Sequence, residues 1–225
     1  MNCCIIGYGK MGKNIERVLK ENSHKVVFVA DNEKELLENK NKINDCDVAF
    51  EFSTPETAYN NLKFCIDNKL PVVCGTTGWT NNLDKIKEYC INNNGTLLYA
   101  PNFSIGMNIF MQVNSLLAKL SSITNMYDVE ISETHHIHKL DKPSGTAILL
   151  KNVIENNSNY KNTKIESIRE GETIGIHTIT YNSNVDSITF THSAKTRDAF
   201  VLGAIFAATK IYDKKGFFEL NDILK

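Results

Sequence analysis

The chain of 225 residues lacks the features that identify several classes of protein. Its formal net charge is only −1, so it presents neither a basic field for nucleic acid nor an acidic tail. No apolar run approaches the roughly 20 residues needed to cross a bilayer. No basic segment near the N-terminus leads into a long apolar stretch, so we expect no signal peptide. These absences predict a cytoplasmic protein without nucleic-acid or membrane partners.

Cysteine spacing gives no indication of a zinc or disulfide framework. All six cysteines lie between Cys3 and Cys90, and none has the CxxC spacing of many metal and redox sites. Several occur in apolar runs, which indicates buried free thiols in a reducing compartment. The chain also has no internal repeat and no low-complexity linker. Its length allows one large domain or two modest ones.

The first hundred residues alternate short apolar runs with helical patterns. Apolar runs occur at residues 2–6, 26–30, 48–52, 71–74 and 96–100. Runs of this length separated by helices of about 10 to 15 residues are typical of βαβ units and a parallel, doubly wound sheet. Each run ends in small or turn-forming residues. Ligands of such sheets bind at the carboxyl ends of the strands, so we expect a cofactor at these loops.

The pattern changes after Asn102. Helices are predicted over residues 105–120, 147–154 and 199–212, and strands over 127–132, 164–169, 175–181 and 186–191. We expect the last three strands to be antiparallel. The chain is therefore interpreted as an α/β protein with an N-terminal Rossmann-like dinucleotide-binding domain and a second, α+β domain. The predicted boundaries are residues 1–104 plus 197–225 for the first domain and 105–196 for the second, which would bind substrate and oligomerise.

Gly7-x-Gly9-x-x-Gly12 directly follows the first predicted strand and opens a helix. The first glycine permits a tight turn, the second lets backbone approach a pyrophosphate, and the third lets the helix pack on the strand. The helix N-terminus also offers free N–H groups and a partial positive charge. The alternative is a glycine turn without a ligand.

Asp31 ends the second predicted strand, 19 residues after Gly12. A carboxylate there can bond the ribose 2′-hydroxyl of a dinucleotide and repels a 2′-phosphate. Asn32 follows, with no arginine to clamp a phosphate, although Lys34 is close. The pattern therefore favours NADH over NADPH. The alternative is that Asp31 only caps the next helix.

A second candidate loop, Gly75-Thr76-Thr77-Gly78, follows the fourth predicted strand. Its glycines leave room for a flat ring, and its hydroxyls can bond a carboxamide. This pattern is only moderately specific, because other turns at strand ends look similar.

Residues 133–147 contain a dense group of titratable side chains. Three of the six histidines, His135, His136 and His138, lie within four residues, and Lys139 follows. A packed core has little use for such groups, whereas a site that holds an anion and transfers a proton needs them. Successive side chains of an extended segment alternate between faces, so His136 and His138 would face one way and His135 the other. Alternation does not decide which set faces a ligand.

The turn at residues 143–146, Pro-Ser-Gly-Thr, opens the next predicted helix. Its backbone N–H groups and the Thr146 hydroxyl make an anion site. Together with the histidines and Lys139, this turn fits a small dicarboxylate that is protonated as it is reduced. A metal site is the weaker alternative. Glu133, His135 and His138 could be ligands, but a second cluster of ligands is missing.

Over essentially its whole length, the chain resembles the dihydrodipicolinate reductase (4-hydroxy-tetrahydrodipicolinate reductase) family of the lysine and diaminopimelate pathway. The resemblance rests on residues 7–12, 75–78 and 100–108, the last reading Ala-Pro-Asn-Phe-Ser-Ile-Gly-Met-Asn. Above all it rests on the family string Glu-x-His-His-x-x-Lys-x-Asp-x-Pro-Ser-Gly-Thr-Ala. Residues 133–147 match this string at every fixed position.

The resemblance implies a role for each matching residue. The pyrophosphate loop would comprise Gly7, Tyr8, Gly9, Lys10, Met11 and Gly12, and the nicotinamide side would be lined by Gly75, Thr76 and Thr77. A second cofactor loop, which is also the hinge between the domains, would comprise Ala100, Pro101, Asn102 and Phe103. His135 and Lys139 would transfer protons, and the substrate carboxylates would be bound by His136, Ser144, Gly145 and Thr146. His138 lies at a position that the family string leaves open, and it is interpreted as structural.

The resemblance also implies the reaction and the assembly. The cofactor, NADH or NADPH, would supply the hydride that reduces 4-hydroxy-tetrahydrodipicolinate to tetrahydrodipicolinate, while the protein supplies position and protons. The sheet of the second domain would build a homotetramer.

Three features depart from the family pattern. The region between Asp31 and Asp47 is compressed, the glycine loop is one residue shorter than in many members, and Ile137 stands where several members carry a basic residue. Arg197, just before the terminal helix, is a further candidate for the site by position alone.

Two other functions are alternatives. A related two-domain amino-acid dehydrogenase, such as diaminopimelate dehydrogenase, would not be expected to carry the string at residues 133–147. A non-catalytic NAD(H)-sensing protein would need a DNA- or partner-binding surface, and the sequence has neither a helix-turn-helix signal nor a basic patch.

Overall fold

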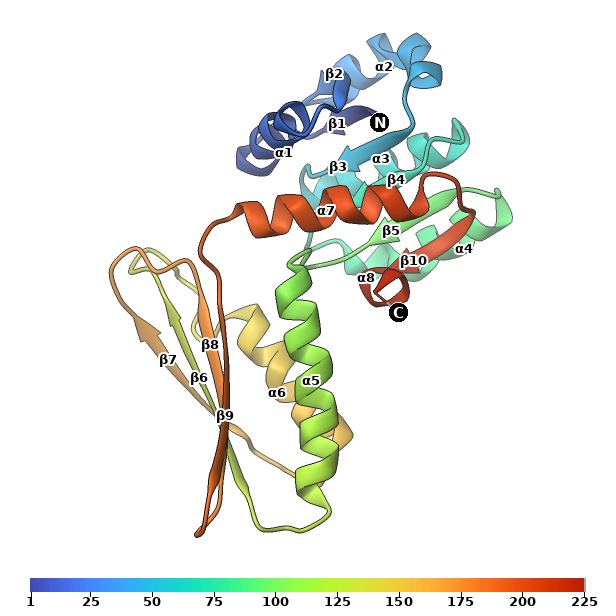
Figure 1. Ribbon diagram of the computed structural model, residues 1–225. Helices are drawn as coiled ribbons and strands as arrows, with labels where there is room; N and C mark the ends of the chain where they lie inside the picture. The colour runs from blue at the N-terminus through green and yellow to red at the C-terminus, as the bar shows by residue number, and fades with distance from the viewer. Residues whose placement is uncertain (225) are drawn as a thin grey trace. The chain divides into compact units, whose positions relative to one another are not determined.

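The computed structural model describes residues 1–224. The chain forms two compact units (Figure 1). The first unit comprises Met1–Ser104 and Phe200–Lys225, and the second comprises Ile105–Ala199. Among the described residues, no helix combines the length and apolar character needed to cross a membrane.

The first unit is built on a six-stranded sheet in the order β10-β5-β4-β3-β1-β2. Its strands are β1 (Asn2–Ile6), β2 (Lys25–Ala30), β3 (Val48–Glu51), β4 (Val72–Cys74), β5 (Thr96–Tyr99) and β10 (Gly216–Glu219). All neighbouring strands pair in parallel, so the predicted parallel sheet is confirmed. Strand β10 was not predicted, because four residues between two helices give too short a pattern to stand out.

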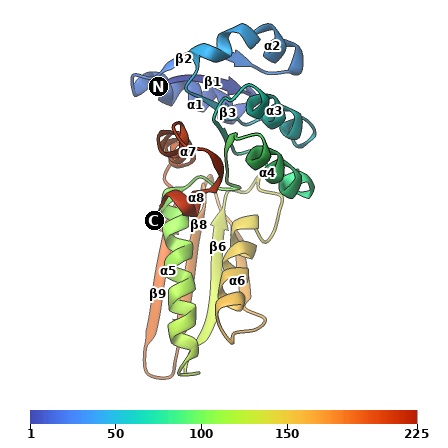
Figure 2. The ribbon, with the colours of Figure 1, turned by 90° about the vertical axis from the view of Figure 1, so that its right-hand side faces the viewer.

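Helices cover both faces of this sheet (Figure 2). They are α1 (Lys10–Glu21), α2 (Glu33–Glu38), α3 (Pro55–Asp67), α4 (Leu83–Asn92), α7 (Asp198–Ile211) and α8 (Leu220–Ile223), with short 3-10 turns η1 (Lys40–Asp45) and η2 (Thr80–Asn82). Alternate residues of β1 enter opposite cores. Ile5 packs with side chains of α1 and α7, whereas Ile6 packs with side chains of α3 and α4. A strand buried on both faces must be continuously apolar, which explains the sequence pattern.

The cysteines belong to these cores. All six are free, and five of them are buried, Cys46 being the partly exposed one. They fill space in the first unit as small apolar side chains.

The second unit is a four-stranded sheet in the order β7-β6-β8-β9 with two helices on one face (Figure 1). Its elements are α5 (Ile105–Ser122), β6 (Asp128–His135), α6 (Gly145–Asn157), β7 (Lys164–Arg169), β8 (Ile176–Asn182) and β9 (Ser187–Ser193). The prediction that β7 is antiparallel was wrong, because β7 pairs in parallel with β6. The chain between them passes through α6, and a crossover helix joins parallel strands. Strands β8 and β9 are antiparallel.

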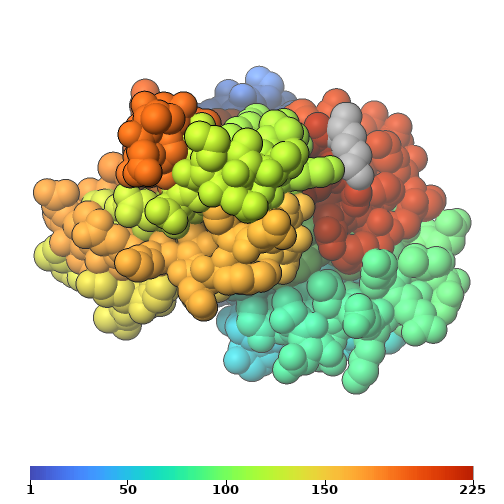
Figure 3. All heavy atoms as spheres, turned by 90° about the horizontal axis from the view of Figure 1, so that it is seen from below, coloured from blue at the N-terminus to red at the C-terminus, as the bar shows by residue number. Residues whose placement is uncertain are grey.

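One face of this sheet and the two helices enclose the core of the second unit. Ile131 and Ile179 from the sheet meet Phe110 of α5 and Leu150 of α6. The ends of α5 and α6 adjoin on the surface (Figure 3). Side chains on the other face of the sheet are largely polar and partly exposed.

Candidate active site

The glycine loop has the geometry that its sequence predicts. Gly7 has a φ of +92°, and a Cβ there would lie 2.3 Å from the carbonyl oxygen of Phe52. A Cβ on Gly12 would lie 2.2 Å from the carbonyl oxygen of Gly7, so α1 packs directly on the turn. Gly9, at the N-cap of α1, has nothing within 4 Å of its Cβ position. The N-terminus of α1 therefore borders open space, with no acidic side chain in its first turn.

Asp31 lies beside this loop rather than at a helix cap. Its Oδ1 accepts a hydrogen bond from the backbone N–H of Tyr8, with N and O 2.6 Å apart. The cap of α2 is Asn32, whose Oδ1 accepts from the backbone N–H of Glu35 at 3.0 Å. The alternative that Asp31 caps the helix is therefore wrong.

A cavity of about 350 Å³ opens at the carboxyl edge of the first sheet. It is lined by Gly9, Lys10 and Met11, by Phe52, Ser53 and Pro55 after β3, and by Gly75, Thr76 and Thr77 after β4. Two of the predicted cofactor loops thus meet at one cavity. The third, residues 100–103, does not line it. Ala100 and Phe103 are buried in the core, where the ring of Phe103 lies 5.8 Å from that of Phe52.

A buried carboxylate that the sequence analysis missed fixes this edge. Glu51, at the end of β3, is fully buried. Its Oε2 accepts hydrogen bonds from Thr76 Oγ1 at 2.7 Å and Cys74 Sγ at 3.1 Å. Its Oε1 accepts from Asn61 Nδ2 at 3.2 Å and from the Ser53 hydroxyl. Glu51 thereby holds together the ends of β3 and β4. The signal was a charged residue inside the apolar run 48–52.

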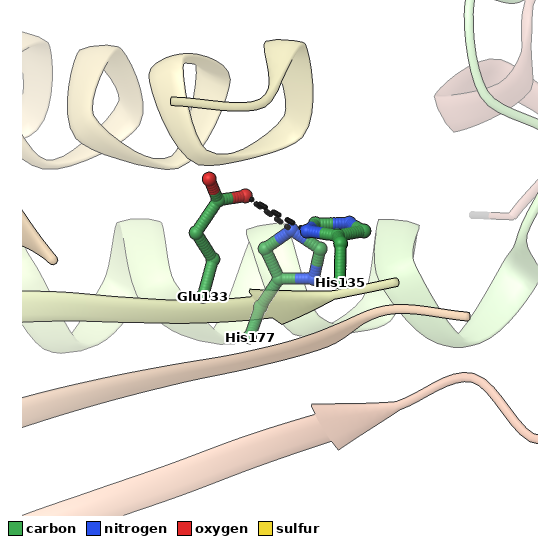
Figure 4. Close-up of side chains that lie close together, drawn as sticks. All are labelled: Glu133, His135 and His177. Atoms are coloured by element: carbon green, nitrogen blue, oxygen red, sulfur yellow. Dashed lines mark ion pairs between the residues drawn. The ribbon is translucent and has the colours of Figure 1, made fainter. Parts of the chain in front are cut away.

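In the second unit, Glu133, His135 and His177 gather on the face of the sheet that the helices cover (Figure 4). Glu133 and His135 come from β6, and His177 comes from β8 directly opposite Glu133. Both imidazoles point toward the same carboxylate oxygen (Figure 4). Oε2 of Glu133 lies 3.1 Å from Nδ1 of His135 and 3.9 Å from Nε2 of His177. All three side chains are buried.

The other oxygen of Glu133 is bound by donors from two further elements. Oε1 accepts from the backbone N–H of Ser144 at 2.9 Å and from Nη2 of Arg169 at 3.3 Å. Burial acts to raise the pKa of Glu133, but the donors Ser144 and Arg169, together with the neighbouring Ser167 hydroxyl, outweigh it and hold the pKa below its usual range. Ser144 in turn caps α6, because its Oγ accepts from the backbone N–H of Ala147 at 3.1 Å.

Burial keeps both histidines neutral near pH 7. It lowers the pKa of His135, to which the positive charges of Lys139 and Arg169 add, while Glu133 opposes the shift. Burial likewise lowers the pKa of His177 to about 4, with His135 as the next influence. Neither ring carries a charge until a proton is supplied.

The loop after β6 is tied to the sheet by Arg169. Its Nη2 donates to the carbonyl oxygen of Asp141 at 2.6 Å and its Nε to that of Lys139 at 3.3 Å. The Lys139 ammonium lies 2.8 Å from Oδ1 of Asp141. His138 is exposed, with Nε2 3.5 Å from a carboxylate oxygen of Glu172.

The predicted substrate residues flank this loop. His136 follows the last residue of β6, and its ring lies 6.2 Å from that of His138. Gly145 begins α6, where nothing lies within 4 Å of its Cβ position, and Thr146 follows it in the first turn. The site therefore has an open helix N-terminus beside a buried acid and two buried histidines.

Arg169 and His177 were not found from the sequence, although both strands that carry them were predicted. Their relation to the site comes from strand register, which places Arg169 beside His135 and His177 beside Glu133. Arg197, proposed by position, is exposed.

The residues that could ligate a metal differ from the predicted set, because His177 takes the place of His138. Ligand atoms of Glu133, His135 and His177 lie within 4.8 Å of one another, whereas His138 is turned to solvent. Arg169 already provides a positive charge at Glu133. The donor set therefore needs no cation to balance its carboxylate.

These features define a class. A parallel sheet with a glycine loop at the first helix, a cavity at its carboxyl edge and a second unit with a buried acid–histidine site are the parts of a two-domain, dinucleotide-dependent oxidoreductase. Comparison with family models narrows the class. Residues 1–103 match the model described as dihydrodipicolinate reductase, N-terminus, and residues 106–224 match dihydrodipicolinate reductase, C-terminus. The chain belongs to the dihydrodipicolinate reductase family, as its sequence predicted.

Individual relatives agree with this placement. A 4-hydroxy-tetrahydrodipicolinate reductase of Christiangramia forsetii is 41% identical over 237 residues, which cover 100% of this chain and 98% of that protein. One of Thermosipho africanus is 36% identical over 223 residues, covering 98% and 96%.

Solved structures show that the fold is shared. A dipicolinate-bound dihydrodipicolinate reductase from Paenisporosarcina sp. TG-14 superposes with a TM-score of 0.82 at 24% identity and covers 97% of both chains. A probable dehydrogenase from Thermotoga maritima reaches a TM-score of 0.61 at 13% identity, covering 99% of this chain and 92% of that one.

Proposed function

We propose that the chain reduces 4-hydroxy-tetrahydrodipicolinate to tetrahydrodipicolinate with NADH or NADPH, in lysine and diaminopimelate biosynthesis. The observation that carries the proposal is the arrangement of residues 133–147. The whole family string falls on one continuous site, formed by the end of β6, the following loop and the start of α6. A related amino-acid dehydrogenase or an NAD(H) sensor would have no need of this site.

The first unit fits a dinucleotide. The N-terminus of α1 borders open space at Gly9, and the glycine loop shares the cavity of about 350 Å³ with Thr76 and Thr77. The pyrophosphate would lie at the helix N-terminus, where free N–H groups and the helix dipole favour negative charge. The bound cofactor would supply a hydride. Asp31, held beside the loop by Tyr8, supports a preference for NADH, because its charge would repel a 2′-phosphate.

The second unit provides anion-binding and proton-transfer groups. Replacing a ring hydroxyl by hydrogen consumes a hydride and a proton and releases water. Lys139 would donate a proton, and His135 would accept a proton or, once protonated, donate it. His136, Ser144, Gly145 and Thr146 would bind substrate carboxylate at the start of α6, whose first turn holds no acidic side chain.

The open face of the second sheet supports a homotetramer. Hydroxyls of Thr178 and Thr191 lie 3.0 Å apart, and those of Thr180 and Thr189 lie 3.2 Å apart, across β8 and β9. Such a face of short polar side chains suits packing against another copy of the sheet. Light scattering of the purified protein should give four times the chain mass, and a monomer mass would contradict the assembly.

Lys139→Ala tests the assignment of the site. Turnover should fall by a factor of at least about 100, because a proton donor and a positive charge are lost. NADH affinity should remain nearly unchanged, because the contacts of Lys139 are to Asp141 and Arg169 in the second unit.

Lys142→Ala, which removes an exposed charge from the same loop, is the matched control and should keep near-normal turnover. Retained turnover in the Lys139 variant, or an equal loss of NADH affinity, would contradict the assignment.

A further inference from the structure

One oxygen of the buried Glu133 carboxylate accepts no hydrogen bond of normal geometry from the described residues. Oε1 accepts from Ser144 and Arg169, as described above. Oε2 has no well-aligned hydrogen bond among the described residues, and neither does Nδ1 of His135, yet these two buried atoms lie 3.1 Å apart. If Nδ1 carried a lone pair, two acceptors would face each other away from water, which is costly. A proton on Nδ1 converts the contact into a hydrogen bond to an ionised acid.

His177 does not take this place. Its Nε2 lies 3.9 Å from Oε2 of Glu133, beyond hydrogen-bond distance, and 3.4 Å from Oγ of Ser144. Its ring meets that of His135 nearly edge to face, with centroids 5.1 Å apart and planes at 76°. His177 therefore limits the orientation of the His135 ring without competing for the oxygen.

The opposite edge of the His135 ring is kept clear by a glycine. A Cβ on Gly175 would lie 3.1 Å from Nε2 and 3.3 Å from Cδ2 of His135. Gly175 is fixed in place, because its carbonyl oxygen accepts from the backbone N–H of Ala194 at 2.9 Å. Any larger residue here would crowd Nε2.

We infer that Glu133 is a positioning residue that fixes His135 as the Nδ1–H tautomer, so that Nε2, beside Gly175, is the atom that exchanges a proton with substrate. The inference rests on the proposed role of His135 in the reaction and adds the orientation of its ring. Neutral Nε2 holds a lone pair and accepts a proton, and protonated Nε2 donates one, while Nδ1 keeps its hydrogen bond throughout. No net proton is lost or gained at Glu133.

The charged and titratable groups that face His135 are Glu133 on its own strand, Lys139 and Asp141 in the loop, Arg169 on β7 and His177 on β8. Glu133 favours the protonated ring, whereas Lys139 and Arg169 disfavour it. Glu133→Gln keeps the size and the acceptor but removes the charge. It should therefore move the His135 titration further below its position in the unaltered protein, by about one pH unit.

The test is a pH titration of the ¹⁵N- and ¹³C-histidine-labelled full chain by NMR, without ligands, with His135→Gln used to assign the signals. We expect the Nδ1–H tautomer at His135 in the unaltered protein and a lower midpoint in Glu133→Gln. His24 belongs to the first unit, where its Nδ1 lies 3.0 Å from the amino group of Met1, and it is the internal control whose titration should be the same in both proteins. An Nε2–H tautomer, or an unmoved midpoint, would overturn the inference. The tautomer alone decides the matter if the variant does not fold.

The pH profile of turnover separates this inference from the proposed function. If His135 is the catalytic group, the acidic limb of the profile should move with the NMR midpoint in Glu133→Gln. A moved midpoint with an unmoved profile would support the positioning by Glu133 and overturn the catalytic role of His135. Gly175→Ala should lower turnover at least tenfold while retaining the Nδ1–H tautomer. Unchanged turnover would overturn the assignment of Nε2 as the reacting atom.

Discussion

Replacement of Glu51 should destabilise the first unit, because four donors converge on its buried carboxylate. Thr76 and Cys74 donate to one oxygen, and Asn61 and Ser53 donate to the other. A hydrogen bond to a charged group contributes about 1.5 to 3 kcal/mol, but bonds in one network are not additive. Glu51→Ala removes the acceptor for all four and should cost about 3 to 5 kcal/mol of unfolding free energy. Glu51→Gln keeps the volume, turns one acceptor into a donor facing donors, and should cost about 1 to 3 kcal/mol.

The fluorescence of the single tryptophan can report the loss of unfolding free energy in these variants. Trp79 is buried, and its indole N–H donates to the carbonyl oxygen of Thr76 at 2.7 Å. Its fluorescence in a urea titration therefore reports on unfolding at the ends of β3 and β4, which Glu51 links. Glu88→Gln removes an exposed acid from the same unit and is the control, with an expected change within about 0.5 kcal/mol.

NADH affinity should fall with stability in the Glu51 variants, because Ser53 and Thr76 line the cavity. Unfolding of Glu51→Gln at the same urea concentration as the unaltered chain would contradict this role of Glu51.

Two further predictions concern cofactor choice and acid stability. Asp31→Ala should weaken NADH binding about tenfold or more and NADPH binding less, since a charged hydrogen bond to a ribose hydroxyl is lost. Equal effects in a fluorescence titration of both cofactors would show that Asp31 does not discriminate. Burial lowers the pKa of His177 from 6.5, its ordinary value in an unfolded chain, to about 4 in the folded protein. Because the unfolded chain then binds the proton more readily, the neutral His177 leaves the folded state at its full stability only above pH 6.5. This contribution of roughly 3 kcal/mol should be lost between pH 6.5 and 4, and His177→Gln should flatten that loss in denaturation curves of the second unit. An unchanged slope would contradict the buried, neutral state.

The nucleotide-binding half of the fold was accessible from the sequence because its signals are local. The glycine loop, the short apolar strands and the small residues at their ends each identify a position without knowledge of its neighbours. Strand β6 was predicted to end at residue 132, yet it continues to His135. Its last buried positions are Glu133 and His135, so the apolar alternation that marks a strand stops where the site begins.

Other parts of the site depend on register and direction, which local patterns do not encode. Arg169 and His177 reach Glu133 only because their strands pair with β6 at particular positions. The direction of β7 follows from the crossover through α6, and the intervening helix could have indicated it. Glu51 is different, since a lone acid within the apolar run 48–52 is itself a local sign of a buried polar contact.

The proposed reaction can be tested by an assay with enzymatically generated 4-hydroxy-tetrahydrodipicolinate and either reduced cofactor. We expect oxidation of the cofactor that requires this substrate, forms tetrahydrodipicolinate and is faster with NADH at limiting concentration. If neither NADH nor NADPH is oxidised in the presence of the substrate, the proposed function is contradicted.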